Sequence, residues 1–172
     1  LPDHLTLYRG HPGIPPFTFA PVTDRILAGR NPLSRLDVER LVAEGVTHIL
    51  DLRERKEWDA PGRLGAEAIA AIPEPGVQYQ SVPIPDTKAP DAAALDAACR
   101  FLTRALKTPS VRVYVHCRGG VERTGAVLTA WTARKDGVTC AQALDSLQAA
   151  NSKLRPLSHQ IEAVTRWLNN SG

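Results

Sequence analysis

Residues 116–125, HCRGGVERTG, combine a thiol and a guanidinium separated by five positions. Cys117 supplies a nucleophile, and Arg123 supplies a planar fork of N–H donors that can bind two oxygens of a phosphate group at once. Gly119 and Gly120 lie between them, where the lack of a side chain lets the backbone turn and approach an oxyanion closely. The spacing therefore favours a site where a sulfur atom attacks a bound oxyanion.

The segments on either side of this loop must position it. Residues 111–115, VRVYV, are β-branched and alternating, which predicts a strand. Residues 124–135 are good helix formers without proline, which predicts a helix. A loop at a helix N-terminus turns several backbone N–H groups toward one point and adds the positive end of the helix dipole. Such a ring of donors binds a dianion and stabilises a thiolate. The hydroxyl of Thr124, at the helix start, can stabilise the sulfur as a leaving group.

The loop resembles the phosphate-binding loop of the protein tyrosine phosphatase superfamily, whose general form is H-C-x-x-G-x-x-R-[ST]. Its fixed positions are met by His116, Cys117, Gly120, Arg123 and Thr124. The short chain is similar to the dual-specificity branch and its bacterial relatives, and we identify it as such a relative. A weaker resemblance extends over residues 26–168. One departure is Glu122, where many relatives carry a small residue, and we expect its carboxylate to point into solvent.

The resemblance also implies a general acid, an Asp on a loop upstream of the cysteine. Asp86 lies 31 residues before Cys117, in a proline-rich stretch after a strand-like run. A carboxylic acid there would protonate the departing oxygen. An ordinary turn Asp is the alternative reading, since Asp commonly follows Pro in turns. Asp91 is the nearest rival, but it stands where a helix N-cap is expected.

The remaining site residues follow from the same resemblance. The phosphate is expected to bind residues 118–123, namely Arg118, Gly119, Gly120, Val121, Glu122 and Arg123. His116 is expected to steady the loop rather than to act as a base. Gln160 matches a Gln that helps to place the hydrolytic water in some relatives. The loop supplies the positive charge, so neither a metal nor another cofactor is expected.

The predicted function is hydrolysis of phosphate monoesters through a phosphocysteine intermediate. Phosphotyrosine on proteins is the preferred substrate, with phosphoserine and phosphothreonine as further substrates. A phosphoinositide or inositol phosphate is the alternative, because related enzymes with almost the same loop take those. Two other classes have less support. A binding module without turnover rests on Glu122 alone, and an arsenate-reducing thiol enzyme would need Cys99 or Cys140 as a resolving thiol.

Composition limits the remaining possibilities. The chain has 172 residues, 43% of them hydrophobic and 23% charged, which suits one globular domain. A net charge of +3 gives no general attraction to nucleic acid or membranes. No apolar run is long enough for a membrane span.

The three cysteines are odd in number and one must be free, which favours a reducing, cytoplasmic location. Nothing indicates an obligate assembly, so a monomer is expected. Residue 1 is Leu and no Met occurs, so a removed leader stays open.

The chain is expected to form one α/β domain, with a mainly parallel central sheet flanked by helices. Residues 1–24, with five prolines, are expected to form an extended arm, and residues 25–172 the phosphatase domain. At the end of the strand at 46–52, Asp51 and Arg53 are expected to pair structurally. Further strands are expected at 25–29 and 77–84, helices at 34–45, 66–72, 91–107, 139–150 and 157–168, and a charged loop at 53–61.

Overall fold

A five-stranded sheet lies at the centre of the computed structural model, which describes residues 16–58 and 76–170. The strand order is β1-β2-β5-β3-β4. The strands are β1 Phe19–Pro21, β2 Ile26–Gly29, β3 His48–Asp51, β4 Gln78–Ser81 and β5 Val113–His116. Only β1 is antiparallel to its neighbour, and β2, β5, β3 and β4 are parallel. The predicted mainly parallel α/β fold is therefore confirmed.

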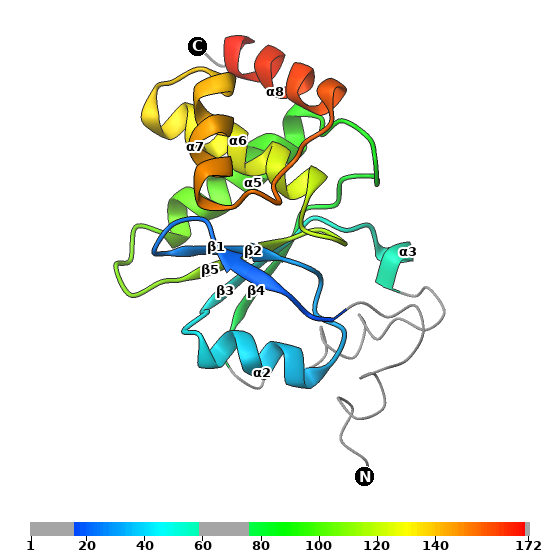
Figure 1. Cartoon of the computed structure of the whole chain (residues 1–172), viewed down its shortest axis with the longest axis vertical. Helices are drawn as coiled ribbons and strands as arrows, with labels where there is room; N and C mark the ends of the chain where they lie inside the picture. The colour runs from blue at the N-terminus through cyan, green and yellow to red at the C-terminus, as the bar shows by residue number, and fades with distance from the viewer. Residues whose placement is uncertain (1–15, 59–75, 171–172) are drawn as a thin grey trace.

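Helices cover both faces of the sheet (Figure 1). On one side lies α2, Arg35–Ala43, and on the other lie α5 Ala92–Ala105, α6 Glu122–Asp136, α7 Cys140–Ala150 and α8 Ser158–Asn170. Neighbouring side chains of the central strands point to opposite faces, as strand geometry requires. In β5, Tyr114 packs in the cluster on the α2 side, whereas Val113 and Val115 pack in the larger cluster under the other helices. Both faces of the central strand are therefore buried.

Several helices begin at the caps that the sequence predicts. The hydroxyl of Ser34 accepts from the N–H of Asp37, and the carboxylate of Asp91 accepts from the N–H of Ala94. At α7, Thr139 and Gln142 form a reciprocal capping box. Asp91 is thus the N-cap of α5, which gives this rival of Asp86 a structural role.

Two expectations need adjustment. The segment 53–61 is not entirely a loop, because Arg55–Trp58 form a one-turn helix, α3. The charged residues there lack the apolar periodicity by which longer helices are found. The strand expected at 77–84 is shorter, because Pro83 has no N–H to donate, although the N–H of Ile84 still donates to the carbonyl of Leu52. The helix expected at 66–72 lies outside the described residues.

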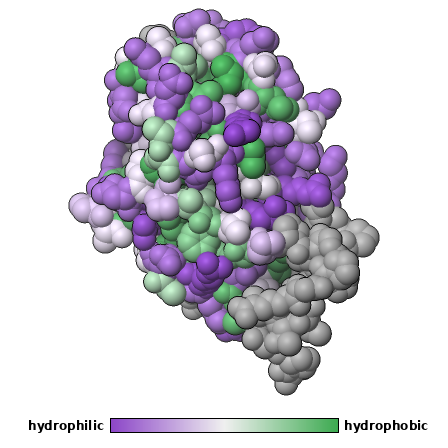
Figure 2. Space-filling view, in the orientation of Figure 1, coloured by the Kyte–Doolittle hydropathy of each residue, from purple (hydrophilic) through white to green (hydrophobic). Residues whose placement is uncertain are grey.

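The predicted arm contributes to the sheet at its C-terminal end. Phe19–Pro21 form the edge strand β1, in register with Gly29, Ala28 and Leu27 of β2. The division between residues 24 and 25 stays a prediction, while residues 1–15 lie outside the described part of the chain. None of the helices that the structure describes is both long enough and apolar enough to cross a membrane. The face shown in Figure 2 is mostly hydrophilic, with hydrophobic residues scattered among the polar ones.

Candidate active site

The carboxyl ends of the four parallel strands meet at one edge of the sheet. His116, the last residue of β5, is in register with Gly29 of β2 and with Asp51 of β3, and Asp51 is in register with Ser81 of β4. The chain after β5 is the Cys117 loop, the chain after β3 leads into α3, and the chain after β4 reaches Asp86. Open parallel sheets bind their ligands at such an edge. The fold therefore brings the predicted nucleophile and the predicted general acid to the same place.

The loop from Cys117 to Arg123 offers its backbone donors to an anion. Cys117 is almost fully buried, with 3% of its surface exposed. The helix α6 starts at Glu122, and its N-cap residue Val121 makes no side-chain capping bond. Within the described chain, the N–H groups of residues 118–121 donate to no backbone carbonyl. A helix N-terminus with unpaired N–H groups binds anions through those groups and through its dipole.

The hydroxyl of Thr124 supports the same reading. Thr124 is fully buried, and its Oγ1 has no hydrogen-bond partner among the described residues. Buried hydroxyls normally have a partner, and an unpaired one calls for a functional explanation. Its place one residue after Arg123 fits the predicted role, in which the hydroxyl donates to the cysteine sulfur when the sulfur carries charge.

Two glycines allow the loop to pack tightly against its surroundings. Gly120 has a φ of 73°, and a Cβ atom there would collide with the backbone of Gly29 on the neighbouring strand. Gly125, in the first turn of α6, lies so close to Pro156 that its Cβ would come within 2.8 Å of the proline Cδ. A side chain at either position would push the loop or the helix away from its support.

Buried polar side chains hydrogen-bond to the backbone of the Cys117 loop and to one another. The Nδ1–H of His116 donates to the carbonyl of Cys117 at 2.9 Å. Arg53 donates from Nε and Nη2 to the two carboxylate oxygens of Asp51 at 3.0 and 2.9 Å, and both residues are buried. The structural pairing predicted for Asp51 and Arg53 is thus confirmed.

Tyr79 also donates to Asp51 at 2.7 Å. In the amide orientation that suits its neighbours, Asn31 joins Arg53 to the carbonyl of the loop residue that follows Cys117.

His116 is neutral at physiological pH. Burial lowers the pKa of His116 to about 4, although the nearby carboxylate of Asp51 favours the charged form. A neutral imidazole whose Nδ1–H is committed to the carbonyl of Cys117 orients the loop backbone. Its role as a support rather than a base stays a prediction.

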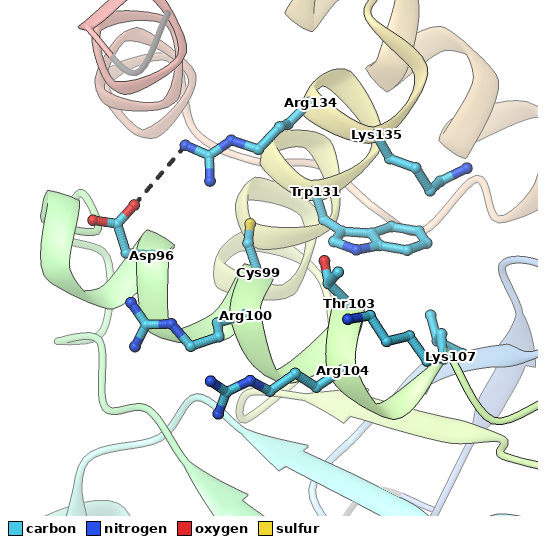
Figure 3. A pocket seen from close by; sticks show the side chains of 10 residues that line it. Asp96, Cys99, Arg100, Thr103, Arg104, Lys107, Trp131, Arg134 and Lys135 are labelled. Atoms are coloured by element: carbon cyan, nitrogen blue, oxygen red, sulfur yellow. Dashed lines mark ion pairs between the residues drawn. The ribbon is translucent and has the colours of Figure 1, made fainter.

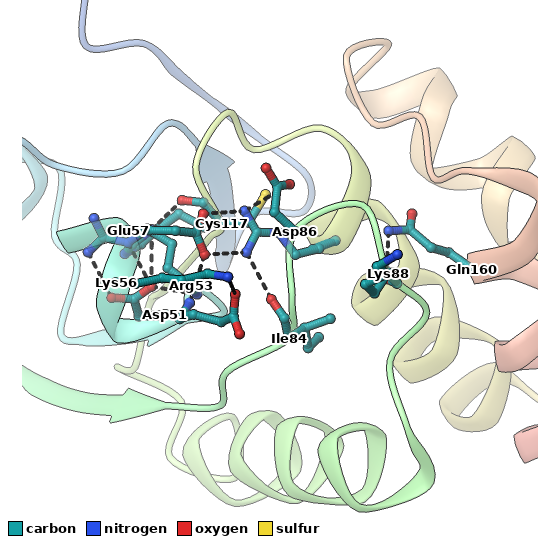
Figure 4. Close-up of polar contacts among 12 residues, drawn as sticks. Asp51, Arg53, Lys56, Glu57, Ile84, Asp86, Lys88, Cys117 and Gln160 are labelled. Atoms are coloured by element: carbon teal, nitrogen blue, oxygen red, sulfur yellow. Dashed lines mark hydrogen bonds and ion pairs between the residues drawn. The ribbon is translucent and has the colours of Figure 1, made fainter. Parts of the chain in front are cut away.

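The guanidinium of Arg123 is held at one end by a carboxylate. Glu57, on α3, accepts from Nη1 and from Nη2 at 2.7 Å each, and the carbonyl of Ile84 also accepts from Nη1 at 2.9 Å (Figure 4). Burial opposes the charge on Glu57, but its bonds to Arg123 lower the pKa of Glu57 below the usual value, so it is ionised at neutral pH. Because Glu57 occupies the edge formed by the two terminal nitrogens, the edge formed by Nε and Nη2 is left for an oxyanion.

Asp86 lies beside this remaining edge. Its Oδ1 is 3.3 Å from Nη2 of Arg123, and 43% of its side chain is exposed. The next residue, Thr87, has a φ of 65°, the one positive value among non-glycine residues in the described ranges. The turn is attached to the start of α8, where Nε2–H of His159 donates to the carbonyl of Thr87 at 2.6 Å. Gln160 likewise donates to the carbonyl of Lys88 at 3.1 Å.

The other predicted residues take varied places. Gln160 is fully buried, and its Oε1 accepts from the N–H of Leu157, so both ends of its amide contact backbone groups. Its action on a hydrolytic water stays a prediction. Arg118 is exposed on the loop, and Glu122 is half-buried. Cys99, Cys117 and Cys140 are all free, buried thiols. Among the residues that the structure describes, no cluster of His, Cys, Asp or Glu could hold a metal ion.

The sequence alone does not identify two residues at the site, Glu57 and His159. Glu57 lies in a segment, residues 53–61, whose charged composition predicts a loop. Sheet topology could have placed it near the site, because a segment that follows a parallel strand next to β5 must start at the same edge of the sheet as the Cys117 loop. His159 directly precedes Gln160, and no pattern in the sequence connects it to a turn 72 residues away.

Comparison with known proteins agrees with this geometry. A family model described as "Polymorphic toxin system, DSP-PTPase phosphatase" matches residues 29–137. Dual specificity protein phosphatase 26 of Bos taurus is 29% identical over 105 residues, which cover 60% of this chain and 46% of that protein. The chain spans less than half the length of the curated relatives it matches.

Solved structures share the fold. The crystal structure of Tk-PTP in its active form superposes with a TM-score of 0.73 at 24% identity, over 88% of this chain and 96% of that one. The crystal structure of PTPMT1 in complex with PI(5)P gives a TM-score of 0.74 at 18% identity, over 88% and 95% of the two chains.

Proposed function

This chain belongs to the DSP-PTPase phosphatase family of polymorphic toxin systems, and on that basis we propose that it hydrolyses phosphate monoesters through a phosphocysteine intermediate. The observation that carries the proposal is the convergence of three groups at one edge of the sheet. A buried thiol lies in a loop of unpaired N–H groups, a guanidinium presents one free edge, and a carboxyl group lies 3.3 Å from that guanidinium.

In the first proposed step, the thiolate of Cys117 attacks phosphorus in line with the ester oxygen. The S–P bond forms as the P–O bond breaks, and the carboxylic acid of Asp86 gives its proton to the departing oxygen. The loop N–H groups and the free edge of Arg123 bind the equatorial oxygens, where charge must be stabilised in phosphoryl transfer.

In the second proposed step, water attacks the phosphorus of the phosphocysteine. The carboxylate of Asp86 takes a proton from that water, the S–P bond breaks, and inorganic phosphate is released. The hydroxyl of Thr124 donates a hydrogen bond to the departing sulfur. The buried, unpaired Oγ1 of Thr124 supports this assignment.

Phosphotyrosine on proteins is the proposed substrate, with phosphoserine and phosphothreonine as further substrates. The support is the similarity to dual specificity protein phosphatase 26. A phosphoinositide is the second candidate, because PTPMT1, which shares the fold, was crystallised with PI(5)P. Exposed cations next to the loop, Arg118 and Arg155, would attract either substrate.

Two parts of the proposal, the reaction and the substrate, can be tested by steady-state hydrolysis. The substrates to compare are p-nitrophenyl phosphate, a phosphotyrosine peptide and PI(5)P in mixed micelles. Wild-type protein is expected to hydrolyse the first two, and an acid quench during turnover is expected to trap phosphate on Cys117. Cys117→Ser should abolish turnover while it still binds inorganic phosphate. Full activity in that variant would contradict the mechanism, and a preference for PI(5)P over the peptide would replace the proposed substrate with the second candidate.

A further inference from the structure

A second concave surface lies between the C-terminal halves of α5 and α6 (Figure 3). It encloses about 640 Å³. Arg100 and Arg104 of α5 and Lys107 of the following turn lie on one side of it, and Lys135 of α6 lies on the other. Trp131 and Cys99, both nearly buried, also line it. We name this surface the α5–α6 groove, and Asp96, Thr103, Leu106 and Arg134 complete its lining.

The cations on the α5 side of the groove lack partners. Arg100, Arg104 and Lys107 are exposed, and within the described chain their side chains make no hydrogen bond or ion pair. Arg100 and Arg104 are four residues apart on α5 and therefore lie on one face of the helix, and Lys107 lines the groove beside them, so these like charges repel one another. The negative end of the α5 dipole offsets this repulsion only in part. An anion in the groove would relieve it.

Another arginine that lines the groove, Arg134, already has partners within the chain. Arg134 stacks over the ring of Trp167 at 3.7 Å and lies 3.9 Å from a carboxylate oxygen of Asp96. Trp167 also donates from Nε1 to Asp96 at 2.9 Å. This cation is therefore already engaged, and Asp96 is the single acidic residue that lines the groove among the described residues. The charge available to a ligand comes mainly from the α5 side.

The lining of the groove selects among anions. Trp131 is 8% exposed and Cys99 is 3% exposed, so the floor of the groove is apolar. Burial also raises the pKa of the Cys99 thiol to about 12, which keeps it uncharged. A small inorganic anion would use the cations alone. A ligand that carries an apolar side chain between carboxylates would contact the cations with its carboxylates and the apolar floor with that side chain. Burial of the apolar surface would then add to the electrostatic attraction.

The groove lies far from the phosphate loop. Lys135 is thirteen residues beyond Glu122 on the same helix, which corresponds to about 20 Å along the axis. The loop is at the N-terminal end of α6 and the groove is at the C-terminal end. A ligand in the groove and a substrate at Cys117 can therefore be bound at the same time.

We propose that the α5–α6 groove binds an acidic segment of a partner protein, one that places an apolar side chain between carboxylates. The carboxylates pair with Arg100, Arg104 and Lys107, and the apolar side chain packs against Trp131. The proposal concerns binding alone and does not require the hydrolytic activity.

Fluorescence anisotropy with three labelled peptides tests it. The first peptide consists of Glu and Asp around one central Leu. The second carries Gln and Asn in place of the acids, and the third carries Ser in place of the Leu. The full chain should bind the first best, and binding should weaken with added salt, because surface charge pairs are screened. The double variant Arg100→Gln/Arg104→Gln should weaken it about tenfold, since it removes two charge contacts.

A matched control removes the same charge elsewhere. Arg35→Gln/Arg166→Gln takes two exposed cations from α2 and α8 and should leave peptide binding unchanged. Thr103→Trp, which fills the groove without altering its charge, should abolish binding. All three variants should keep the melting temperature and the p-nitrophenyl phosphate hydrolysis of the wild type.

Three results would overturn the proposal. One is equal weakening by the control variant, which would show an effect of net charge alone. Another is equal affinity for the Leu and Ser peptides together with displacement by tripolyphosphate, which would show a general anion site. The last is binding of phosphatidylserine vesicles through the same arginines without binding of the peptide.

Discussion

The loop of Cys117 and the turn of Asp86 lie at the same edge of the sheet but are held in different ways. In the cysteine loop Cys117, Gly120 and Arg123 are buried, and the loop packs against Gly29 and rests on a network that includes His116 and Asp51. The turn of Asp86 is exposed and is attached through two side chains of α8. A phosphate-binding loop must hold its donors in place before the substrate arrives. The segment that carries the general acid, in contrast, must not block the release of the product. We infer that the loop stays fixed during turnover and that the turn moves.

The largest effect is expected from a change at the centre of the fixed region. Arg123→Lys keeps the charge but loses the two-pronged edge and both bonds to Glu57. Turnover of p-nitrophenyl phosphate should fall about 10²- to 10³-fold, as it does when one oxyanion donor is removed elsewhere. Arg118→Lys is the matched control on the exposed part of the loop and should retain most of the activity. Unchanged turnover in Arg123→Lys would mean that charge alone is required, and an equal loss in Arg118→Lys would mean that the loss is not specific to the forked edge of Arg123.

A second effect should appear in stability rather than in rate. Below about pH 6.5 the unfolded chain protonates His116, whereas the folded chain resists protonation down to about pH 4. The unfolded state therefore binds more protons in this window, and the free energy of unfolding should drop by roughly 3 kcal/mol as the pH falls through it. Denaturant titrations of the wild type and of His116→Asn measure the difference between them.

In that experiment the Asn variant should lose less stability than the wild type between pH 6.5 and 4. Asp51 acts in a separate window. Burial works against its charge, but His116 and Arg53 lower the pKa of Asp51, so its contribution is lost only below its ordinary value of 3.8. Parallel pH profiles for the two proteins would show that the folded chain does not hold His116 as a neutral, buried imidazole.

The carboxylate that holds Arg123 should have a smaller effect on rate. Glu57→Gln keeps the shape but turns one acceptor into a donor that faces N–H groups of Arg123. We expect kcat/KM to fall about tenfold, which is the usual size of the loss of one charge-assisted hydrogen bond. Glu54→Gln changes a neighbouring carboxylate, paired with Lys56, and should leave the rate unchanged. An equal loss in both variants would argue against the specific hold on Arg123.

The smallest effect is expected at the attachment of the Asp86 turn to α8. His159→Ala removes the donor to Thr87, and kcat should fall about threefold with KM unchanged, because one neutral hydrogen bond is lost. His159→Gln, which can still donate, should restore part of the rate, and Ser158→Ala should have no effect. Weaker inhibition by inorganic phosphate in His159→Ala, with kcat unchanged, would place His159 in the fixed region instead.

The sequence predicted those parts of the site that are continuous along the chain. Residues 116–124 could be interpreted directly, because the strand, the loop and the helix that shape the site are adjacent. Asp86 could be proposed because the family resemblance implies an Asp upstream of the cysteine, and Asp86 lies 31 residues before Cys117 in a proline-rich stretch after a strand-like run. Glu57 could not be assigned, because its role depends on α3, a helix too short to show periodicity. His159 depends on a contact between α8 and a turn 72 residues earlier, which no local pattern encodes.

The bond between Glu57 and Arg123 also affects how readily an oxyanion binds. A free arginine side chain loses roughly 2 kcal/mol of rotamer entropy when a ligand fixes it. Here the guanidinium has already lost that freedom on folding, since a carboxylate and the carbonyl of Ile84 hold it. An arriving phosphate therefore meets an immobile receptor, and more of its interaction energy is expressed as affinity.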